Sequence, residues 1–347
     1  MIEHNRPWIT LQDRAAVDAV LASGWVAQGP VTEALEAAFV AMHGGGSACA
    51  VSSGTAALAL ALRAAGVAAG MSVGVPSYAC SALLNAIQWV GARPAVSDVL
   101  VGRFTLDCGT LERPVDAVVA VHAFGAPACI ADCRKIAPIV IEDCCQSLGG
   151  EIGGRPLGEI GDAAVYSFYA SKIVCGGQGG LVWSSRASLV AGVRDYRQFD
   201  GREAYEPRFN LQLTDMQAAL ALSQMQRLAL IRQRRTSLAQ RYREAMPADL
   251  AYQDGLLEPG CMPQRYVVVA PEQWVRDALA RHMGSAGVHC IIPVERFELL
   301  HRYLGLDPQR FPVAEHLADT TLSLPLYPAL TEAQADQVCE ALRTFCP

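Results

Sequence analysis

The sequence predicts an α/β protein built around a mainly parallel β-sheet, and two observations support this prediction. Short runs rich in β-branched residues alternate with longer segments of helical periodicity, the order typical of βαβ units. The 347 residues are 52% hydrophobic and 18% charged, which is enough apolar material for a large core and, by length, for roughly two domains. The predicted strands are residues 72–76, 94–97, 117–121, 139–142, 163–167 and 180–183, and the helices between them include residues 55–65, 81–90 and 129–136.

A long helix over residues 214–246 is expected to connect two domains. Thr214 and Gln217 have the spacing of a capping box, and apolar residues recur at helical spacing after them. Beyond this helix the pattern changes, so we expect a large domain over residues 1–246 and a smaller C-terminal α/β domain over residues 247–347. The elements predicted in the second domain are a strand over residues 265–270 and helices over residues 271–286 and 332–343.

Charge and hydropathy argue against two classes of partner. The net charge is −6 and no basic run exists, so a surface that binds nucleic acid is not expected. No apolar stretch is long enough, and free enough of charge and glycine, to span a membrane. The first ten residues lack a basic stretch followed by an apolar run, which argues against secretion.

The twelve cysteines are scattered, and no Cys-x-x-Cys pair is present, so we expect no metal site. In a chain without a secretion signal, buried reduced thiols are the simpler interpretation. This predicts a cytoplasmic protein.

A small polar turn, Ser52-Ser-Gly-Thr55, leads into an apolar helix. The N-terminus of a helix has free backbone N–H groups and the positive end of the helix dipole, so it can bind phosphate. The same residues can also do no more than cap the helix.

A second polar position follows an apolar strand, in Ile139-Val-Ile-Glu-Asp143. Open α/β sheets bind ligands at the C-terminal ends of their strands, which makes Asp143 a candidate site residue. The alternative is that its carboxylate only caps the next turn.

Only two lysines occur among the 28 basic residues, Lys135 and Lys172. A predicted strand delivers Ser167, and Lys172 follows five residues later among small and apolar side chains, ahead of a glycine-rich segment. Desolvation favours the neutral amine that Schiff-base chemistry requires, so Lys172 is the candidate nucleophile. Lys135 is expected on the polar face of a helix, without a chemical role.

Segments with a recognisable order and spacing run through nearly the whole chain. They are residues 23–30, Ser53-Gly-Thr, Val75-Pro-Ser, residues 142–146, residues 167–172, Asn210, residues 214–219, residues 311–315 and residues 324–328. With these segments the chain resembles the DegT/DnrJ/EryC1/StrS family of sugar aminotransferases. The resemblance implies a fold-type I pyridoxal 5'-phosphate (PLP) enzyme, whose large domain has a mainly parallel seven-stranded sheet flanked by helices.

The resemblance also implies roles for individual residues. Lys172 matches the lysine that holds PLP as a Schiff base, and Asp143 matches the carboxylate that pairs with the pyridinium nitrogen. A carboxylate at that place keeps the ring nitrogen protonated, as an electron sink requires. The other matches are Gln146 near the phenolic oxygen, Gly54, Thr55 and Ser167 at the phosphate, and Asn210 at the phosphate of a neighbouring subunit's cofactor.

Three positions depart from the family pattern. Where many relatives have an aromatic residue stacked on the ring, an ungapped match gives Cys80, so either this thiol or Tyr78 is expected to pack there. Gln178 stands where the family usually has Glu. Arg296 falls near the place of a substrate-side His. These departures concern the substrate pocket more than the cofactor.

The resemblance predicts a transaminase with ping-pong kinetics that takes an amino group from a donor, L-glutamate, through pyridoxamine 5'-phosphate to a nucleotide-linked 3- or 4-keto-6-deoxy sugar. Lys172 serves as covalent anchor and as general acid and base. A homodimer with shared sites follows if Asn210 reaches the partner. The alternatives are an acceptor that is a keto cyclitol or another non-nucleotide ketone, a PLP-dependent sugar dehydratase, which has His in place of Lys172, and a non-catalytic regulator.

Overall fold

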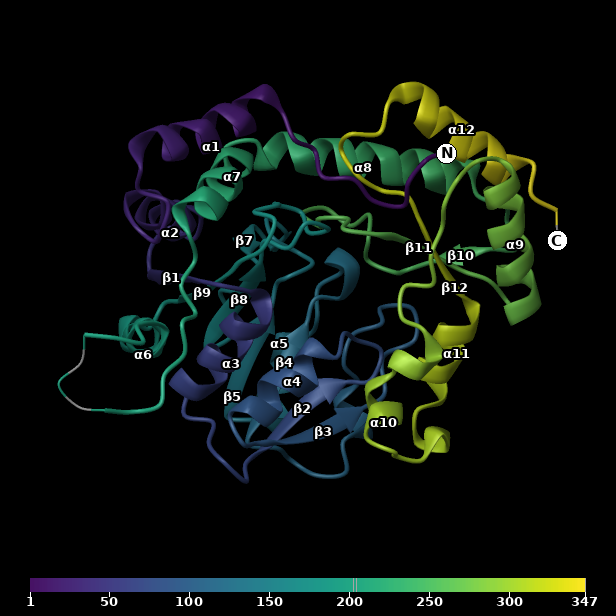
Figure 1. Ribbon diagram of the computed structural model, residues 1–347. Helices are drawn as coiled ribbons and strands as arrows, with labels where there is room; N and C mark the ends of the chain where they lie inside the picture. The colour runs from purple at the N-terminus through teal and green to yellow at the C-terminus, as the bar shows by residue number, and fades with distance from the viewer. Residues whose placement is uncertain (202, 204, 347) are drawn as a thin grey trace.

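The computed structural model describes residues 1–201, 203 and 205–346, which form a large unit and a smaller one joined by a long helical segment (Figure 1). The large unit is built on a seven-stranded sheet within these residues. Four of its six strand pairings are parallel, and the two that involve β9 are antiparallel. In spatial order the strands are β1 (Ser47–Val51), β9 (Gly180–Ser184), β8 (Ala163–Ser167), β5 (Ile139–Asp143), β4 (Ala117–Val121), β2 (Ser72–Pro76) and β3 (Arg93–Ser97).

The predicted mainly parallel sheet is therefore confirmed, and each of the six predicted strands is present within one residue at either end. Strand β1 is not among the predicted strands. Its sequence, Ser-Ala-Cys-Ala-Val, contains a single β-branched residue, and it is held in place by its antiparallel pairing with β9.

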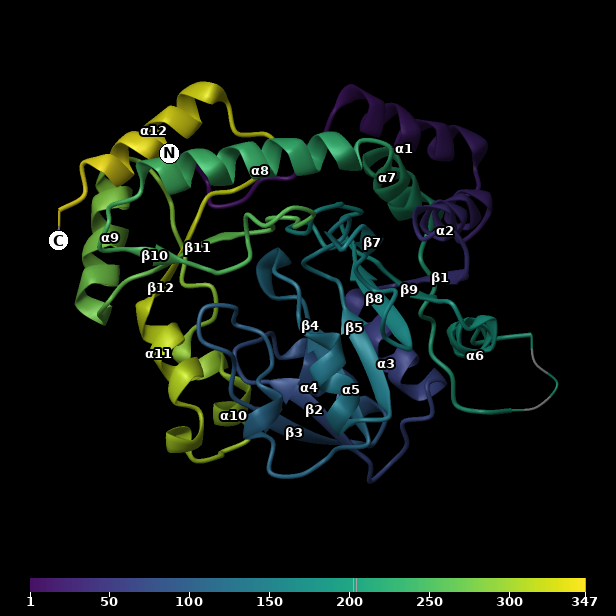
Figure 2. The same ribbon diagram turned by 180° about the vertical axis from the view of Figure 1, so that it is seen from behind.

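Helices cover both faces of the large sheet (Figures 1 and 2). Alternate residues of β4 separate the two faces: Val119 and Val121 belong to the core cluster that contains α3, and Val118 and Ala120 belong to the cluster that contains α5. The helices on the first face are α3 (Gly54–Ala64), α4 (Ala82–Trp89) and α6 (Ala187–Arg197), and those on the second are α2 (Pro30–Met42) and α5 (Ile130–Ile136).

The single helix predicted over residues 214–246 is wrong in one respect, because it is broken into α7 (Asp215–Met225) and α8 (Leu228–Ala245). Its capping box at Thr214 is present. At the break, buried Asp13 of α1 (Leu11–Ser23) accepts hydrogen bonds from Ser223 Oγ (2.7 Å) and Arg227 Nη2 (2.6 Å). These tertiary contacts override local helix propensity at Arg227.

The smaller unit contains a three-stranded antiparallel sheet of β10 (Ala251–Tyr252), β11 (Tyr266–Val269) and β12 (Thr321–Leu324). Its core is shared with the second half of α8, which contributes Leu238 and Tyr242. The predicted strand and both predicted helices are confirmed, the latter as α9 (Gln273–Ser285) and α12 (Glu332–Arg343). The division at residues 246 and 247 stays a prediction.

A last segment of the chain returns to the large unit. Helices α10 (Leu300–Tyr303) and α11 (Pro312–Thr320) place Leu300, Ala314 and Leu317 in the core cluster of α3 and α4. The N-terminus of α11 is tied to β3's end, because Asp98 accepts hydrogen bonds from the N–H groups of Val313 and Ala314. In the described parts of the chain, no helix combines the length and the apolar character needed to cross a bilayer.

Candidate active site

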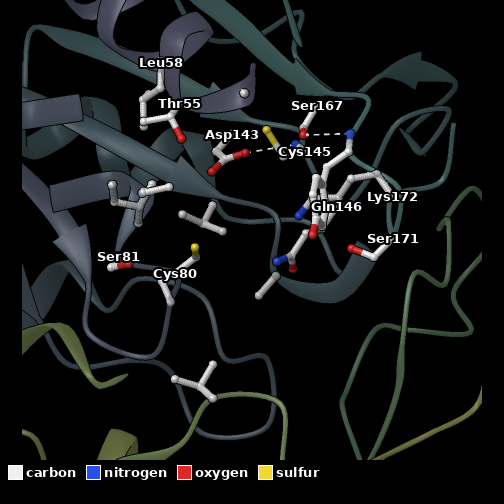
Figure 3. Close-up of a pocket in the computed structure, with 18 of the residues that line it drawn as sticks. Thr55, Leu58, Cys80, Ser81, Asp143, Cys145, Gln146, Ser167, Ser171 and Lys172 are labelled. Atoms are coloured by element: carbon white, nitrogen blue, oxygen red, sulfur yellow. Dashed lines mark hydrogen bonds between the residues drawn. The ribbon is translucent and has the colours of Figure 1, made fainter. Parts of the chain in front are cut away.

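A cavity of about 410 Å³ lies at the C-terminal ends of β5 and β8, where the small unit approaches the large one. Asp143 ends β5, Ser167 ends β8, and Lys172 lies in the turn that follows; all three line the cavity. Figure 3 shows Asp143 between Thr55 and Cys80, with Cys145 beside it and with Ser167 and Lys172 farther away on the side of Cys145. The fold thus brings together residues from separate segments at the edge where open α/β sheets bind ligands.

The N-terminus of α3 forms one end of the cavity. Ser53 caps the helix, because its Oγ accepts a hydrogen bond from Ala56 N (3.1 Å), while Gly54 and Thr55 of the first turn line the cavity. A Cβ atom on Gly54 would lie 2.9 Å from Ser167 Cβ, closer than real Cβ atoms approach. Because Ser53 caps the helix, Gly54 and Thr55 of the same turn remain able to bind a phosphate, so the two interpretations of this turn are compatible.

The sequence leaves two roles open for Asp143, a ligand contact or a cap of the next turn, and the structure is consistent with both. Its carboxylate is half-buried, and Oδ1 accepts a hydrogen bond from Cys145 N (2.9 Å), so one oxygen does cap the turn. The carboxylate still faces the cavity. Burial, and then the charge of Asp143, raise the pKa of the Cys145 thiol well above its usual value, so this neighbour is a neutral thiol at physiological pH.

Behind Asp143, Glu142 is fully buried and holds the strand end in place. Its two oxygens accept four hydrogen bonds, from His122 Nε2 (3.1 Å) and from the N–H groups of Gly158, Ile160 and Gly161. Burial opposes ionisation of Glu142, but these hydrogen bonds prevail and lower its pKa. The ionised Glu142 thus organises the loop beside the site.

The turn that carries Lys172 is held by backbone and side-chain contacts. Lys172 N donates to Tyr169 O (2.9 Å), and Ser167 Oγ accepts from Tyr169 N (3.4 Å). Gln264 Nε2 of the small unit donates to Ser171 O (3.2 Å), immediately before the lysine. Both units therefore fix the position of the Lys172 backbone.

Lys135 lies far from this chemistry, as the sequence predicts. It is in the last turn of α5, its side chain is 74% exposed, and it pairs with Asp132 at 2.7 Å. The hydrogen bond to Asp132 raises the pKa of Lys135, which keeps it a surface ammonium.

Gln146 lines the cavity with its side chain fixed, because Oε1 accepts a hydrogen bond from Phe124 N (2.7 Å). Phe124 lies in a short 3-10 turn, Ala123–Gly125, with a φ of 54°, a value rare for a bulky residue. The strained turn aims its N–H at Gln146, which leaves the Gln146 amide NH₂ as a donor toward the cavity.

Tyr78 and Cys80, the two residues considered for packing against the cofactor ring, occupy different places. Tyr78 borders the cavity but is itself buried, and its hydroxyl is engaged with Thr321 Oγ1 at 2.7 Å. Cys80 is exposed to the cavity. The structure therefore favours the thiol over the tyrosine as the group that faces a bound ligand. Gln178 also lines the cavity.

Two predicted residues are not brought to the cavity within one chain. Asn210 is exposed, and its Oδ1 accepts a hydrogen bond from Gln212 N (3.3 Å). Arg296 does not line the cavity; it pairs with Asp319 and approaches Glu315 at 3.5 Å. The expectation that Arg296 occupies a substrate-side position is therefore not supported by its location.

Several lining residues have no individual role assigned from the sequence, although the segment over residues 289–298 is one on which the choice of substrate is expected to depend. They come from the small unit and from segments with no motif of their own, and they include Arg265, Pro293, Val294, Glu298 and Tyr303. Their contribution depends on how the small unit docks, and neither periodicity nor local spacing encodes that.

The chain matches known proteins over nearly its whole length. The model of the DegT/DnrJ/EryC1/StrS aminotransferase family matches residues 7–343. EryC1 of Saccharopolyspora erythraea, described as an erythromycin biosynthesis sensory transduction protein, is 34% identical over 345 residues, which cover 93% of this chain and 92% of that protein.

Two solved structures share the architecture. The PLP form of Spr1654 from Streptococcus pneumoniae, described as a sugar aminotransferase, has a TM-score of 0.90 at 23% identity, covering 99% of this chain and 98% of that one. DesV of S. venezuelae, in complex with a ketimine intermediate, has a TM-score of 0.86 at 29% identity, covering 95% of this chain and 93% of that one.

Proposed function

We propose, from the premise that the chain belongs to the DegT/DnrJ/EryC1/StrS aminotransferase family and is a PLP-dependent aminotransferase, that it transfers an amino group from L-glutamate to a nucleotide-linked 3- or 4-keto-6-deoxy sugar. One observation carries the proposal for this chain. A single cavity contains an amine, Lys172, and a carboxylate, Asp143, beside the N-terminus of a helix.

The residues of the cavity fit PLP at each of its ends. Hydroxyl and N–H groups of Gly54, Thr55 and Ser167 suit a phosphate, and the missing Cβ of Gly54 lets the α3 turn approach Ser167 closely. The Asp143 carboxylate suits a protonated ring nitrogen, and Lys172 suits the aldehyde carbon. Bound PLP supplies an aldehyde that condenses with amines and a ring that accepts electrons from the adjacent carbon.

Each of these residues then has a defined task. The α3 N-terminus and Ser167 bind the phosphate, Asp143 holds a proton on the ring nitrogen, and Gln146 donates to the phenolic oxygen. Lys172 Nζ would take the proton from Cα of the amino donor and deliver it to the former aldehyde carbon of the cofactor, on the other side of the donor nitrogen, and it would do the reverse for the keto sugar. Cys80 packs against one face of the ring.

The alternatives are distinguished by the same residues. A dehydratase of this family would have His where Lys172 stands, and nothing in the cavity favours that reaction. The regulatory alternative is set aside, because the family is one of aminotransferases. A keto cyclitol would use the same cofactor residues, so only the acceptor assay separates it from a nucleotide sugar.

The proposal is tested by incubating the holoenzyme with L-glutamate and a panel of keto acceptors, namely dTDP- and UDP-linked 3-keto and 4-keto sugars and a keto cyclitol. We expect amino product with a nucleotide-linked sugar and none with Lys172→Ala. Arg103→Gln, which alters a surface ion pair with Glu258, is the matched control and keeps the activity. Product from the cyclitol alone would refute the nucleotide-sugar assignment.

A homodimer with shared sites completes the proposal. Asn210 is exposed and lies outside its own chain's cavity, which suits a residue that reaches the phosphate in the partner. Free thiols at all twelve cysteines agree with a reducing compartment, so we place the enzyme in the cytoplasm.

A further inference from the structure

Two cysteines meet on the second face of the large sheet, outside the active-site cavity. Cys108 begins a short 3-10 helix, Cys108–Thr110, and Cys133 lies in α5, with its sulfur 4.0 Å from that of Cys108. All twelve cysteines are described as free thiols, and these two are the pair whose sulfurs are in hydrogen-bond contact. Neither lines the cavity, so the pair takes no part in the chemistry described above.

The backbone on both sides of the sulfur pair is held in place. Asp107 caps the 3-10 helix, because its Oδ1 accepts a hydrogen bond from Gly109 N (2.9 Å). Cys133 is in the middle of α5, and Val115 N donates to Ile136 O (3.0 Å), which ties the chain that follows the 3-10 helix to the end of α5. The two sulfurs are therefore neighbours wherever the large unit is folded.

The two thiols differ in exposure and in acidity. Cys108 is half-buried, whereas Cys133 is buried. A hydrogen bond from Cys133 lowers the pKa of Cys108, and the same contact, together with burial, raises the pKa of Cys133. An accessible thiolate beside a second, protected thiol is the arrangement typical of a redox-sensitive cysteine and the cysteine that resolves it.

Cys129 provides an internal comparison. It is the N-cap residue of α5, four positions before Cys133, and it is the more exposed thiol. A hydrogen bond to Asp132 raises the pKa of Cys129, so less of it is thiolate at a given pH. Exposure alone therefore favours Cys129, whereas thiolate character and a neighbouring sulfur favour Cys108.

We propose that Cys108 and Cys133 form a reversible disulfide by exchange with a low-molecular-weight disulfide such as oxidised glutathione. The Cys108 thiolate attacks one sulfur of that disulfide, which forms a mixed disulfide and expels the other half as a thiolate. Cys133 passes its proton to this thiolate and attacks the Cys108 sulfur, which expels the second half.

The exchange is balanced in atoms and electrons. The second thiolate takes up the proton that Cys108 gave to solvent, so two protein thiols are oxidised while one external disulfide is reduced to two thiols. The two sulfurs approach from 4.0 Å to about 2.0 Å, which rotation about the two Cα–Cβ bonds supplies. The inference does not depend on the donor or the acceptor proposed above.

The disulfide would enclose the part of the chain that positions Gln146. The closed loop over residues 108–133 contains β4 and the turn Ala123–Gly125, in which Phe124 N donates to Gln146. A cross-link across about 25 residues restricts the unfolded chain and should lower the equilibrium constant for unfolding on the order of 100-fold. Because the sulfurs lie outside the cavity, the Kd for PLP should stay the same.

The test exposes the folded, PLP-loaded protein to oxidised glutathione and maps its thiols by mass spectrometry without reduction. Trypsin leaves Cys108 and Cys133 on one peptide, because Pro114 follows Arg113, so a second cleavage after Glu112 is needed to separate them. We expect one disulfide between the two resulting peptides, no glutathione retained on either cysteine, and full reversal by excess reduced glutathione.

Three variants separate the roles of the thiols. Cys133→Ser should stop the exchange at the mixed disulfide and retain one glutathione on Cys108. Cys108→Ser should form no disulfide and leave Cys133 unmodified; it replaces a half-buried side chain, so this comparison remains if Cys133→Ser folds poorly. Cys129→Ser is the matched control and should behave as the wild type. Only the wild type and this control should melt at a higher temperature after oxidation.

Several outcomes would overturn the inference. Glutathione retained on Cys108 of the wild type, or two unmodified thiols, would show that Cys133 does not resolve the exchange. A disulfide that joins Cys129 to either residue would assign the exchange to a different pair. A Cys108–Cys133 disulfide that leaves the melting temperature unchanged, or that weakens PLP binding, would contradict a cross-link compatible with the native site.

Discussion

The close approach of Gly54 to Ser167 allows a sharp test of the phosphate cradle by the substitution Gly54→Ala. The added Cβ would lie 2.9 Å from Ser167 Cβ, 3.1 Å from Ser167 Oγ and 3.4 Å from Cys145 Sγ. Ser167 Oγ can rotate away, but Ser167 Cβ is fixed to β8. Either the α3 turn or the strand end must therefore shift by several tenths of an ångström.

Overpacking of this kind costs about 1–3 kcal/mol. Because the strain falls on the two elements that would hold the phosphate, it should appear in cofactor affinity, which corresponds to a roughly 5- to 150-fold higher Kd for PLP. The affinity is measured by titrating apoprotein with PLP and following the absorbance of the complex. The fold itself should survive, because Gly54 has helical backbone angles that alanine adopts readily.

Gly284→Ala is the matched control for this substitution. Gly284 lies within α9, and a Cβ at this position would meet no heavy atom within 4 Å. The control should leave the Kd for PLP unchanged and should raise thermal stability slightly, by at most about 1 kcal/mol, because alanine is the better helix former. If Gly54→Ala binds PLP as tightly as the control does, the cradle is not formed as described here.

Three further predictions concern other parts of the site. Glu142→Gln should destabilise the protein by about 2–4 kcal/mol at pH 7, because the NH₂ group of the glutamine would face buried donors. The pKa of Glu142 in the folded protein is lowered from its ordinary value of 4.5. The difference in melting temperature between variant and wild type should therefore shrink as the pH falls through 4.5 and below it, where the wild-type carboxylate becomes protonated. PLP should protect Cys80, but not Cys129, from alkylation by iodoacetamide, as read by mass spectrometry; equal labelling would remove Cys80 from the cofactor face. Asn210→Ala and Lys172→Ala should each be inactive alone, yet subunit exchange between them should restore about a quarter of wild-type activity, and no recovery would contradict shared sites.

The sequence predicts those parts of the fold in which local and tertiary preferences agree. Residues 117–121 are a continuous Ala and Val run buried on both sides, and they form a strand with the predicted bounds. Strand β1 escapes prediction because Ser, Ala and Cys carry little strand preference, and only pairing with β9 decides its conformation. The break at Arg227 escapes it because the cause, Asp13, lies more than 200 residues away.

The residues of the candidate site also fall into two groups, those that the sequence predicts and those that only the structure reveals. Lys172, Asp143 and Ser167 follow strands and stand in recognisable motifs, so their convergence could be expected. The presence of Arg265 in the cavity could not be expected, because it comes there only through the docking of the small unit. His122 likewise gains its role from Glu142, twenty residues further along the chain and on the neighbouring strand.

The central claim is that Lys172 holds PLP covalently, and the scarcity of lysine makes it directly measurable. The holoenzyme is reduced with borohydride, digested and mapped by mass spectrometry. With only two lysines in the chain, the account predicts the phosphopyridoxyl label on Lys172 and none on the exposed Lys135. A label on Lys135, or no label on Lys172 in protein saturated with PLP, would contradict it.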